Sequence, residues 1–161
     1  MRQRLLTQLL QVPADLDYVE SFQELSRINL ELRRHGPNAQ RLLRKASLER
    51  AVGNHAASLV ACQDALVLDP ENPEMHYHVG LAFMFLSLAK ADALPVGPNP
   101  TEVPTDSLTT LLGKAVEAFR TVLRHNPRDQ DAREDLQAIE RVLHDHLTDE
   151  QLSDALRSKK V

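Results

Sequence analysis

Two stretches of the sequence align with each other without gaps, and each ends in the same kind of break. Residues 55–73 read HAASLVACQDALVLDPENP, and residues 112–130 read LGKAVEAFRTVLRHNPRDQ. Small or apolar residues coincide in the two stretches, and Pro70 takes the same position as Pro127. Because proline cannot continue a helix interior, both apolar runs are expected to be helices that stop at these prolines. A segment that recurs in this way indicates an internal repeat.

The rest of the chain has the pattern of an all-helical protein. Aromatic residues make up only 4% of the sequence, and there is no tryptophan. Apolar residues recur at spacings of three and four, with glycine or proline between the runs, which is typical of amphipathic helices. We therefore predict helices at about 2–11, 14–34, 38–52, 55–68, 73–91, 106–125, 129–147 and 149–157.

Individual residues are expected to cap or bury parts of these helices. Thr105 or Asp106 is the expected cap of the helix at 106–125. Thr148 and Gln151 have the spacing of a capping box for the last helix. The buried stripe of the helix at 14–34 is expected to comprise Phe22, Leu25, Ile28 and Leu32.

Residues 39–72 resemble the tetratricopeptide repeat family, whose unit is about 34 residues folded as two antiparallel helices. The resemblance implies an all-α fold of antiparallel helical hairpins stacked as a short solenoid, with N-terminal and C-terminal capping helices. Within it, Gly80 would allow two helices to approach closely. The positions that carry the resemblance are Leu42, Ala46, Gly53, Ser58, Cys62, Ala65, Leu68 and Asp69-Pro70, followed by Tyr77, Val79, Gly80 and Phe83.

The chain also departs from the family pattern. Pro127 follows Pro70 by 57 residues, which is 23 more than the family length. The unit at 39–72 has Leu42 where the family has a large aromatic residue and Glu49 where tyrosine is usual. The proline-rich residues 93–104 are expected to be an exposed loop, acting either as a spacer or as a binding loop.

We predict one domain, 1–161, with five parts. They are N-terminal helices at 1–37 that could be a degenerate repeat, a repeat at 39–72, a repeat at 73–129 with the insertion near 87–110, a capping helix at 130–147, and a short helix and tail at 148–161.

Repeats of this family use the inner faces of their first helices as a groove. Carried over by position, the resemblance implies a partner-binding groove, in which arginines at one end and acids at the other suit a peptide with apolar anchors and charge. The alternative is that Leu81 and Phe85 pack against the terminal helices of the chain itself. The implied groove residues are Leu43, Arg44, Ser47, Arg50, Tyr77, His78, Leu81 and Phe85, with Asp131, Glu134, Asp135 and Arg141 from the helix at 129–147.

Some family members bind a C-terminal carboxylate with lysine and asparagine at set groove positions. Those positions carry Leu43, Ser47 and His78 in this chain, so we do not expect that ligand.

The sequence offers little for catalysis or metal binding. His76 and His78 are two residues apart, as are His144 and His146, and such pairs point about 200° apart on a helix. We therefore expect no metal site, and we predict no cofactor and no enzymatic activity, since no catalytic motif is found. The single cysteine, Cys62, is expected to be buried and unreactive.

Charge and hydropathy limit the classes of partner. The net charge of −4 argues against nucleic acid, and no run approaches the ~20 apolar residues of a membrane span. The start, MRQRLLTQLLQV, resembles a signal peptide, but its apolar part is short and interrupted, so we expect a cytoplasmic protein.

The predicted function is a non-catalytic protein-interaction module, an adaptor or scaffold that binds a peptide or helix of a protein partner. The alternative is a dedicated client chaperone, similar in size and acidity to the chaperones of type III secretion. An enzyme on a helical scaffold is a third hypothesis. Homo-oligomer formation is possible in each case.

Overall fold

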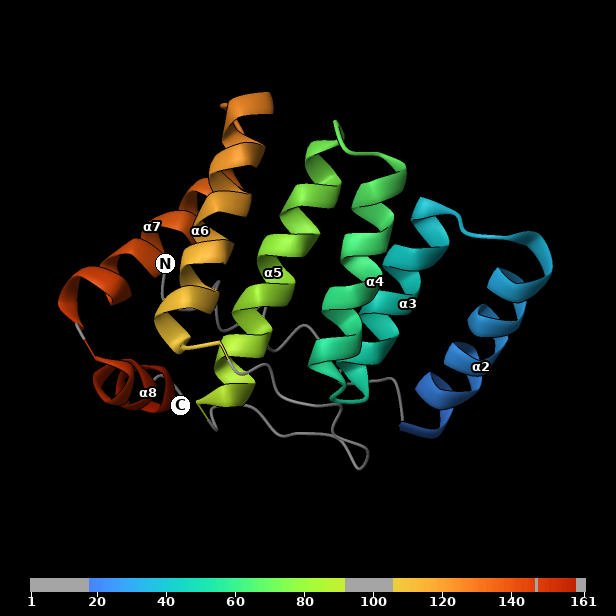
Figure 1. The fold of residues 1–161 in the computed structure, drawn as a ribbon, viewed down its shortest axis with the longest axis horizontal. Helices are drawn as coiled ribbons and strands as arrows, with labels where there is room; N and C mark the ends of the chain where they lie inside the picture. The colour runs from blue at the N-terminus through green and yellow to red at the C-terminus, as the bar shows by residue number, and fades with distance from the viewer. Residues whose placement is uncertain (1–17, 92–105, 147, 159–161) are drawn as a thin grey trace.

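The computed structural model describes residues 18–91, 106–146 and 148–158. These residues form seven helices and contain no strand, so the described chain is all-helical (Figure 1). The helices are α2 (Tyr18–His35), α3 (Ala39–Ala51), α4 (His55–Leu68), α5 (Pro73–Lys90), α6 (Leu108–His125), α7 (Gln130–Asp145) and α8 (Asp149–Ser158).

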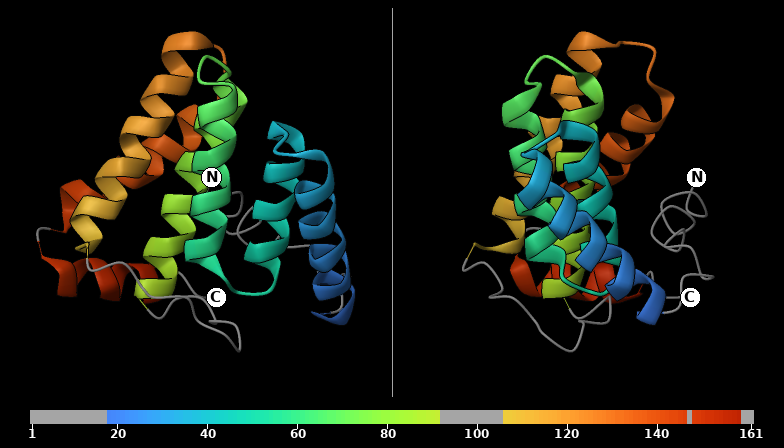
Figure 2. Two further views of the ribbon diagram at one scale, coloured as in Figure 1. Left: turned by 45° about the vertical axis from the view of Figure 1, so that its right-hand side comes forward. Right: turned by 90° about the vertical axis from the view of Figure 1, so that its right-hand side faces the viewer.

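Each helix from α2 to α7 packs against the next one along the chain, and the closest packing joins α3 to α4 and α5 to α6. Helices α3, α4, α5 and α6 therefore stand side by side in chain order (Figure 1). Viewed at 90° to Figure 1, the same helices overlap one behind another (Figure 2, right). Helix α8 folds back against α5, α6 and α7. Packing between successive helices is consistent with a helical repeat, in which each unit contacts its neighbours.

The two aligned stretches end in the same way. The backbone N–H of Asp69, after α4, and that of Asn126, after α6, each donates to the carbonyl oxygen four residues earlier, at 3.2 and 2.7 Å. Three residues further on, the side chains of Asn72 and Asp129 accept backbone N–H groups in the first turns of α5 and α7. The similarity of the two stretches, which lie 57 residues apart, thus extends from the sequence to the caps and turns of the structure.

The aligned helices also bury equivalent positions. In α4 and α6 these positions carry small or apolar side chains that are 0–1% exposed. A serine, a cysteine and an alanine of α4 take the places of an alanine, a phenylalanine and a valine of α6. The three matched pairs are Ser58 with Ala115, Cys62 with Phe119, and Ala65 with Val122.

Gly80 lies where α5 meets α6. A Cβ atom placed on Gly80 would come within 2.8 Å of Cε1 and 2.9 Å of Cζ of Phe119, a side chain that is fully buried. A side chain at this position would therefore force Phe119 or the backbone around it to shift. The expectation that Gly80 permits a close helix contact is confirmed.

Helices α5 and α6 are longer than the preceding pair, with 18 residues each against 13 in α3 and 14 in α4. Where these long helices are joined, the ammonium group of Lys90 donates to the backbone oxygen of Asp106, and Lys114 pairs with the Asp106 carboxylate at 2.8 Å. The two flanking helices account for part of the predicted insertion. The proposed helix at 2–11 and the loop at 93–104 lie outside the described residues.

Two of the sequence predictions are wrong in detail. Phe22 is 36% exposed, and Ser21, only 1% exposed, takes its place in the stripe that α2 turns toward α3. Helix α6 begins at Leu108 and is capped by Ser107, whose hydroxyl accepts the backbone N–H of Thr110 at 3.1 Å. Asp106 is not the cap, because the helix begins two residues later than expected, and Thr105 lies outside the described residues.

The capping box at the start of α8 is confirmed. The backbone N–H of Thr148 donates to the side chain of Gln151 at 3.2 Å, and that of Gln151 donates to the Thr148 hydroxyl at 3.1 Å. This reciprocal pair satisfies two of the N–H groups that a helix start leaves without intrahelical partners.

Candidate partner-binding surface

Four of the predicted groove residues come together at the end of α3 and along α5. We call Arg50, Tyr77, His78 and Phe85 the Arg50 cluster. The guanidinium carbon of Arg50 lies 4.7 Å from the centre of the Phe85 ring, a cation–π distance. The rings of Tyr77 and His78 lie 6.2 Å apart, edge to face.

Arg50 is a half-buried cation without a carboxylate partner in the described residues. Its Nε atom is shielded from solvent and has no hydrogen-bond acceptor among them. Burial lowers the pKa of the guanidinium, while the proximity of Cys62 and Tyr77 acts in the opposite direction. Arginine nevertheless stays charged in proteins, so the Arg50 cluster carries one positive charge.

His78 adds no charge to the cluster at neutral pH. Burial lowers the pKa of its imidazole, and the nearby charge of Arg50 lowers it further. Glu74, whose carboxylate is 3.9 Å from Nε2 of His78, acts in the opposite direction. His78 is therefore a neutral, half-buried hydrogen-bonding group beside the guanidinium.

Tyr77 connects α5 to α7. Its hydroxyl donates a hydrogen bond of 2.9 Å to Asp135, and its ring packs against Phe119 of α6 with the ring centres 5.5 Å apart. Burial raises the pKa of the Asp135 carboxyl to about 6, although the Tyr77 hydrogen bond lowers it. The neighbouring acids of α7 raise it further.

The other predicted groove residues of α3 take part in local structure. Arg44 makes two hydrogen bonds of 2.8 Å to the carboxylate of Glu24 in α2, so its charge is already paired. The hydroxyl of Ser47 donates to the carbonyl oxygen of Leu43 at 3.1 Å, and Leu43 is buried in the core. Of these residues, Ser47 is half-buried and has a small side chain.

On α5, Leu81 is half-buried and packs at the edge of the core, whereas Phe85 is only 3% exposed. Positions 78, 81 and 85 are spaced three and four apart and share one face of the helix. The buried ring of Phe85 therefore packs against the guanidinium of Arg50. Leu81 and His78 are the more accessible residues of this helix face. Whether a partner binds these residues stays a prediction.

Sequence reasoning missed His55, the first residue of α4. Its ring stacks against Phe85 with the centres 6.1 Å apart and the planes 5° from parallel, and the side chain is buried. The only available signal was the tight turn at Gly53-Asn54, which brings the start of α4 back beside the end of α3. His55 thus helps to fix the ring on which Arg50 rests.

Helix α7 carries the acids predicted for the far end of the groove. Glu134 accepts a hydrogen bond from Gln130 of the same helix at 2.7 Å, and Asp131 is exposed. The structure ties Asp135 to the Arg50 cluster through Tyr77. Arg141 is exposed on α7 and lines a hollow of that helix.

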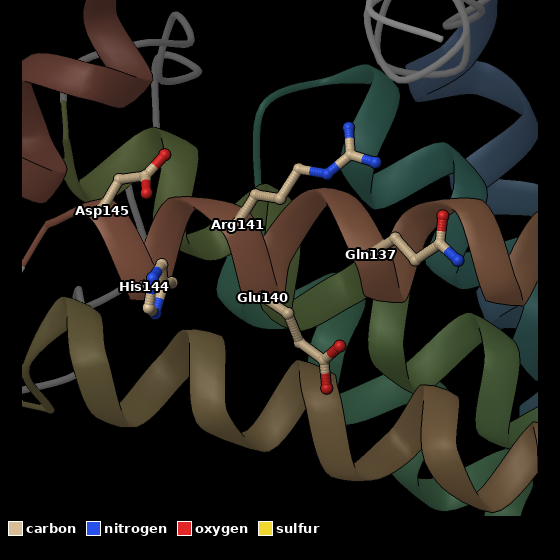
Figure 3. A pocket seen from close by; sticks show the side chains of 5 residues that line it. All are labelled: Gln137, Glu140, Arg141, His144 and Asp145. Carbon is tan, nitrogen blue, oxygen red and sulfur yellow. The ribbon is translucent and has the colours of Figure 1, made fainter.

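That hollow is an open depression of about 310 Å³ along α7, lined by Gln137, Glu140, Arg141, His144 and Asp145. The side chains do not converge on one point: Arg141 and Asp145 extend to one side of the helix, and Glu140 to the other (Figure 3). Glu140 is also held by Arg120 of α6 at 2.8 Å. The arrangement does not offer the converging groups that a catalytic site needs.

Among residues 18–91, 106–146 and 148–158, no group of three or more histidine, cysteine or acidic side chains could hold a metal ion. His76 contacts the carbonyl oxygen of Pro70 at 2.7 Å and stacks on His125. Cys62 is fully buried, and burial raises the pKa of its thiol to about 11, although Arg50 lowers it. Within the same residues, no helix has the length and apolar character needed to cross a membrane.

No protein-family model matches the chain, and a comparison with curated proteins finds no match either.

Proposed function

We propose that the chain is a short helical-repeat module of the tetratricopeptide type that binds a protein partner and performs no chemistry. The face of α3 and α5 that carries Ser47, Arg50, His78 and Leu81 is the proposed binding surface. The family resemblance of residues 39–72 supports this placement, since α3 and α5 correspond to the first helices of two successive units.

The observation that carries the proposal is the equivalence of the two helix ends at Asp69 and Asn126, with their matching caps at Asn72 and Asp129. Equivalent ends indicate that the two units are copies of one hairpin, and stacked copies present a continuous face. Arg50 supplies that face with a charged group and the half-buried Leu81 supplies apolar surface, which is the combination that peptide-binding surfaces use.

Ser47 offers a clean test, because its side chain is small and bonds only to its own helix. The substitution Ser47→Arg would place a bulky cation on the proposed surface without removing a core contact. The tagged chain would be used to capture partners from a lysate of its native cells, with mass spectrometry as the readout. We expect the unmodified chain to capture at least one protein that Ser47→Arg does not capture.

Gln63→Arg is the matched control, since Gln63 is exposed on α4, which contributes none of the surface residues. Both variants should have the circular dichroism spectrum and melting temperature of the unmodified chain. Equal capture by the unmodified chain and both variants would reject this binding surface. A captured protein that loses its own stability when the chain is absent would favour the client-chaperone alternative.

A further inference from the structure

Among the described residues, Arg50 is the arginine that has a nitrogen shielded from solvent and without a hydrogen-bond acceptor. Arg44 is paired with Glu24, Arg120 with Glu140 and Arg157 with Asp154, all on the surface. Arg50 is more deeply placed than these, yet no carboxylate of the described residues lies within pairing distance of it. A shielded charge without a partner costs free energy, so its retention calls for an explanation.

The acid nearest to Arg50 in the sequence is committed elsewhere. Glu49 is buried and accepts a hydrogen bond of 3.0 Å from Asn54, in the turn between α3 and α4. The groups close enough to affect the Arg50 charge are Cys62, Tyr77 and His78, and none of them is an anion at neutral pH. Phe85 holds the guanidinium by its ring and offers no hydrogen-bond acceptor.

Building on the proposed function, we infer that Arg50 is the anchor for a carboxylate of the bound partner, an aspartate or glutamate side chain in a peptide segment that also carries an apolar residue. The planar guanidinium fits the two oxygens of a carboxylate, and the contact would satisfy the shielded Nε atom. The apolar residue of the partner would lie on Leu81, which shares a helix face with His78 and Phe85.

The charges at this site favour a carboxylate over a phosphate. A phosphate group carries close to two negative charges and is usually bound by more than one cation. The other arginines of α3 are already paired with acids of α2, Arg41 with Glu31 and Arg44 with Glu24. His78 is neutral. One unpaired positive charge therefore balances one singly charged anion. The overall charge of −4 disfavours nucleic acid as its source.

The test uses the full chain and a library of short random peptides displayed on phage. Peptides are kept when they bind the unmodified chain and fail to bind Ser47→Arg. We expect these peptides to share an aspartate or glutamate. A synthetic peptide of this set, and its version with the acid changed to the amide, are then titrated against the unmodified chain, Arg50→Gln and Arg50→Lys.

The inference predicts that the amide version binds the unmodified chain about tenfold or more weakly, because a charged hydrogen-bonded pair is lost. Arg50→Gln should bind both versions with the same weak affinity, and Arg50→Lys should keep part of the preference for the acid. Arg128→Gln is the control for charge alone, because Arg128 is exposed in the turn between α6 and α7. The acid and amide peptides are compared on the unmodified chain, so the result of that comparison does not depend on whether Arg50→Gln folds.

Equal binding of the acid and amide peptides to the unmodified chain would overturn the inference while leaving the proposed surface intact, since Ser47→Arg still abolishes binding. Failure to obtain any peptide that depends on Ser47 would overturn both. Dissociation of a dimer by Arg50→Gln would assign the carboxylate to a second copy of the chain and would overturn a foreign partner.

Discussion

At the scale of single residues, the absence of a side chain at Gly80 determines how closely α5 and α6 meet. A Cβ atom there would lie 2.8 Å from the fully buried ring of Phe119, which is closer than carbon atoms can pack. Gly113, in the middle of α6, is different, because a Cβ atom there would meet nothing within 4 Å. The same substitution at the two glycines should therefore have opposite effects.

We expect Gly80→Ala to lower the free energy of unfolding by about 1–3 kcal/mol, since the overlap with Phe119 outweighs the better helix propensity of alanine. Gly113→Ala should raise it by about 0.5–1 kcal/mol, because only the propensity and chain-entropy gain remains. Urea unfolding followed by circular dichroism measures both. Two changes of the same sign would show that α5 and α6 do not approach each other as described.

Asp135 should make stability depend on pH. Its pKa is raised from 3.8 to about 6 in the folded chain, mainly by burial, so between these values the folded chain binds more protons than the unfolded chain. The contribution of Asp135 to the free energy of unfolding is therefore most favourable below the pKa of the unfolded chain, and it is lost as pH rises through the pKa of the folded chain. Asp135→Asn should abolish that contribution, about 1–3 kcal/mol, and keep an acceptor for the Tyr77 hydroxyl.

The measurement is the free energy of unfolding in urea at several pH values between 4 and 7, compared between the unmodified chain and Asp135→Asn. The same change at Asp64, which is exposed on α4, is the control. Identical pH profiles of the unmodified chain and Asp135→Asn would mean that the carboxyl is solvated and that the contact between α5 and α7 is looser than described.

At the scale of helices, Asn72 and Asp129 lie 57 residues apart and cap the starts of α5 and α7 in the same way. Each side chain accepts a backbone N–H in the first turn of its helix, at 3.0 and 2.9 Å. The exposed residues just before these caps, Glu71 and Arg128, are also equivalent and contribute no cap. The repeat therefore provides two matched caps and two matched controls.

Asn72→Ala and Asp129→Ala should each lower the free energy of unfolding by about 1 kcal/mol, the usual effect of removing an N-cap. Glu71→Ala and Arg128→Ala should change it by less than about 0.5 kcal/mol, because both residues are on the surface. Thermal and urea unfolding of the four variants would decide the point. If only one of the two cap variants loses stability, the junctions are not equivalent.

Helix positions were largely predictable from the sequence, because prolines and glycines mark the ends of apolar runs. The ends of α4 at Leu68 and of α6 at His125 match the predicted ends. The start of α6 was predicted wrongly, since Thr105, Asp106 and Ser107 are all good caps and only the backbone path selects among them. Phe22 was misplaced because a stripe that starts at Ser21 fits the same helical spacing.

At the scale of the whole molecule, the sequence predicted an all-helical chain and the structure agrees throughout the residues that it describes. The similarity between α4 and α6 was visible because their buried positions carry small or apolar residues at the same offsets. The Arg50 cluster was predictable only as a set of positions. Its defining features, the Phe85 ring beneath the guanidinium and the stacked His55, depend on packing between α3, α4 and α5.

Whether this face binds a partner is tested most directly by photo-crosslinking. A photo-reactive benzoyl-phenylalanine would replace His78 on α5 in one version of the full chain and Gln63 on α4 in another, and both would be irradiated in native cells. We predict that a single protein is crosslinked from position 78 and not from position 63, at a peptide that contains an acid. Crosslinks from position 63 alone, or from neither position, would contradict a binding surface on α3 and α5.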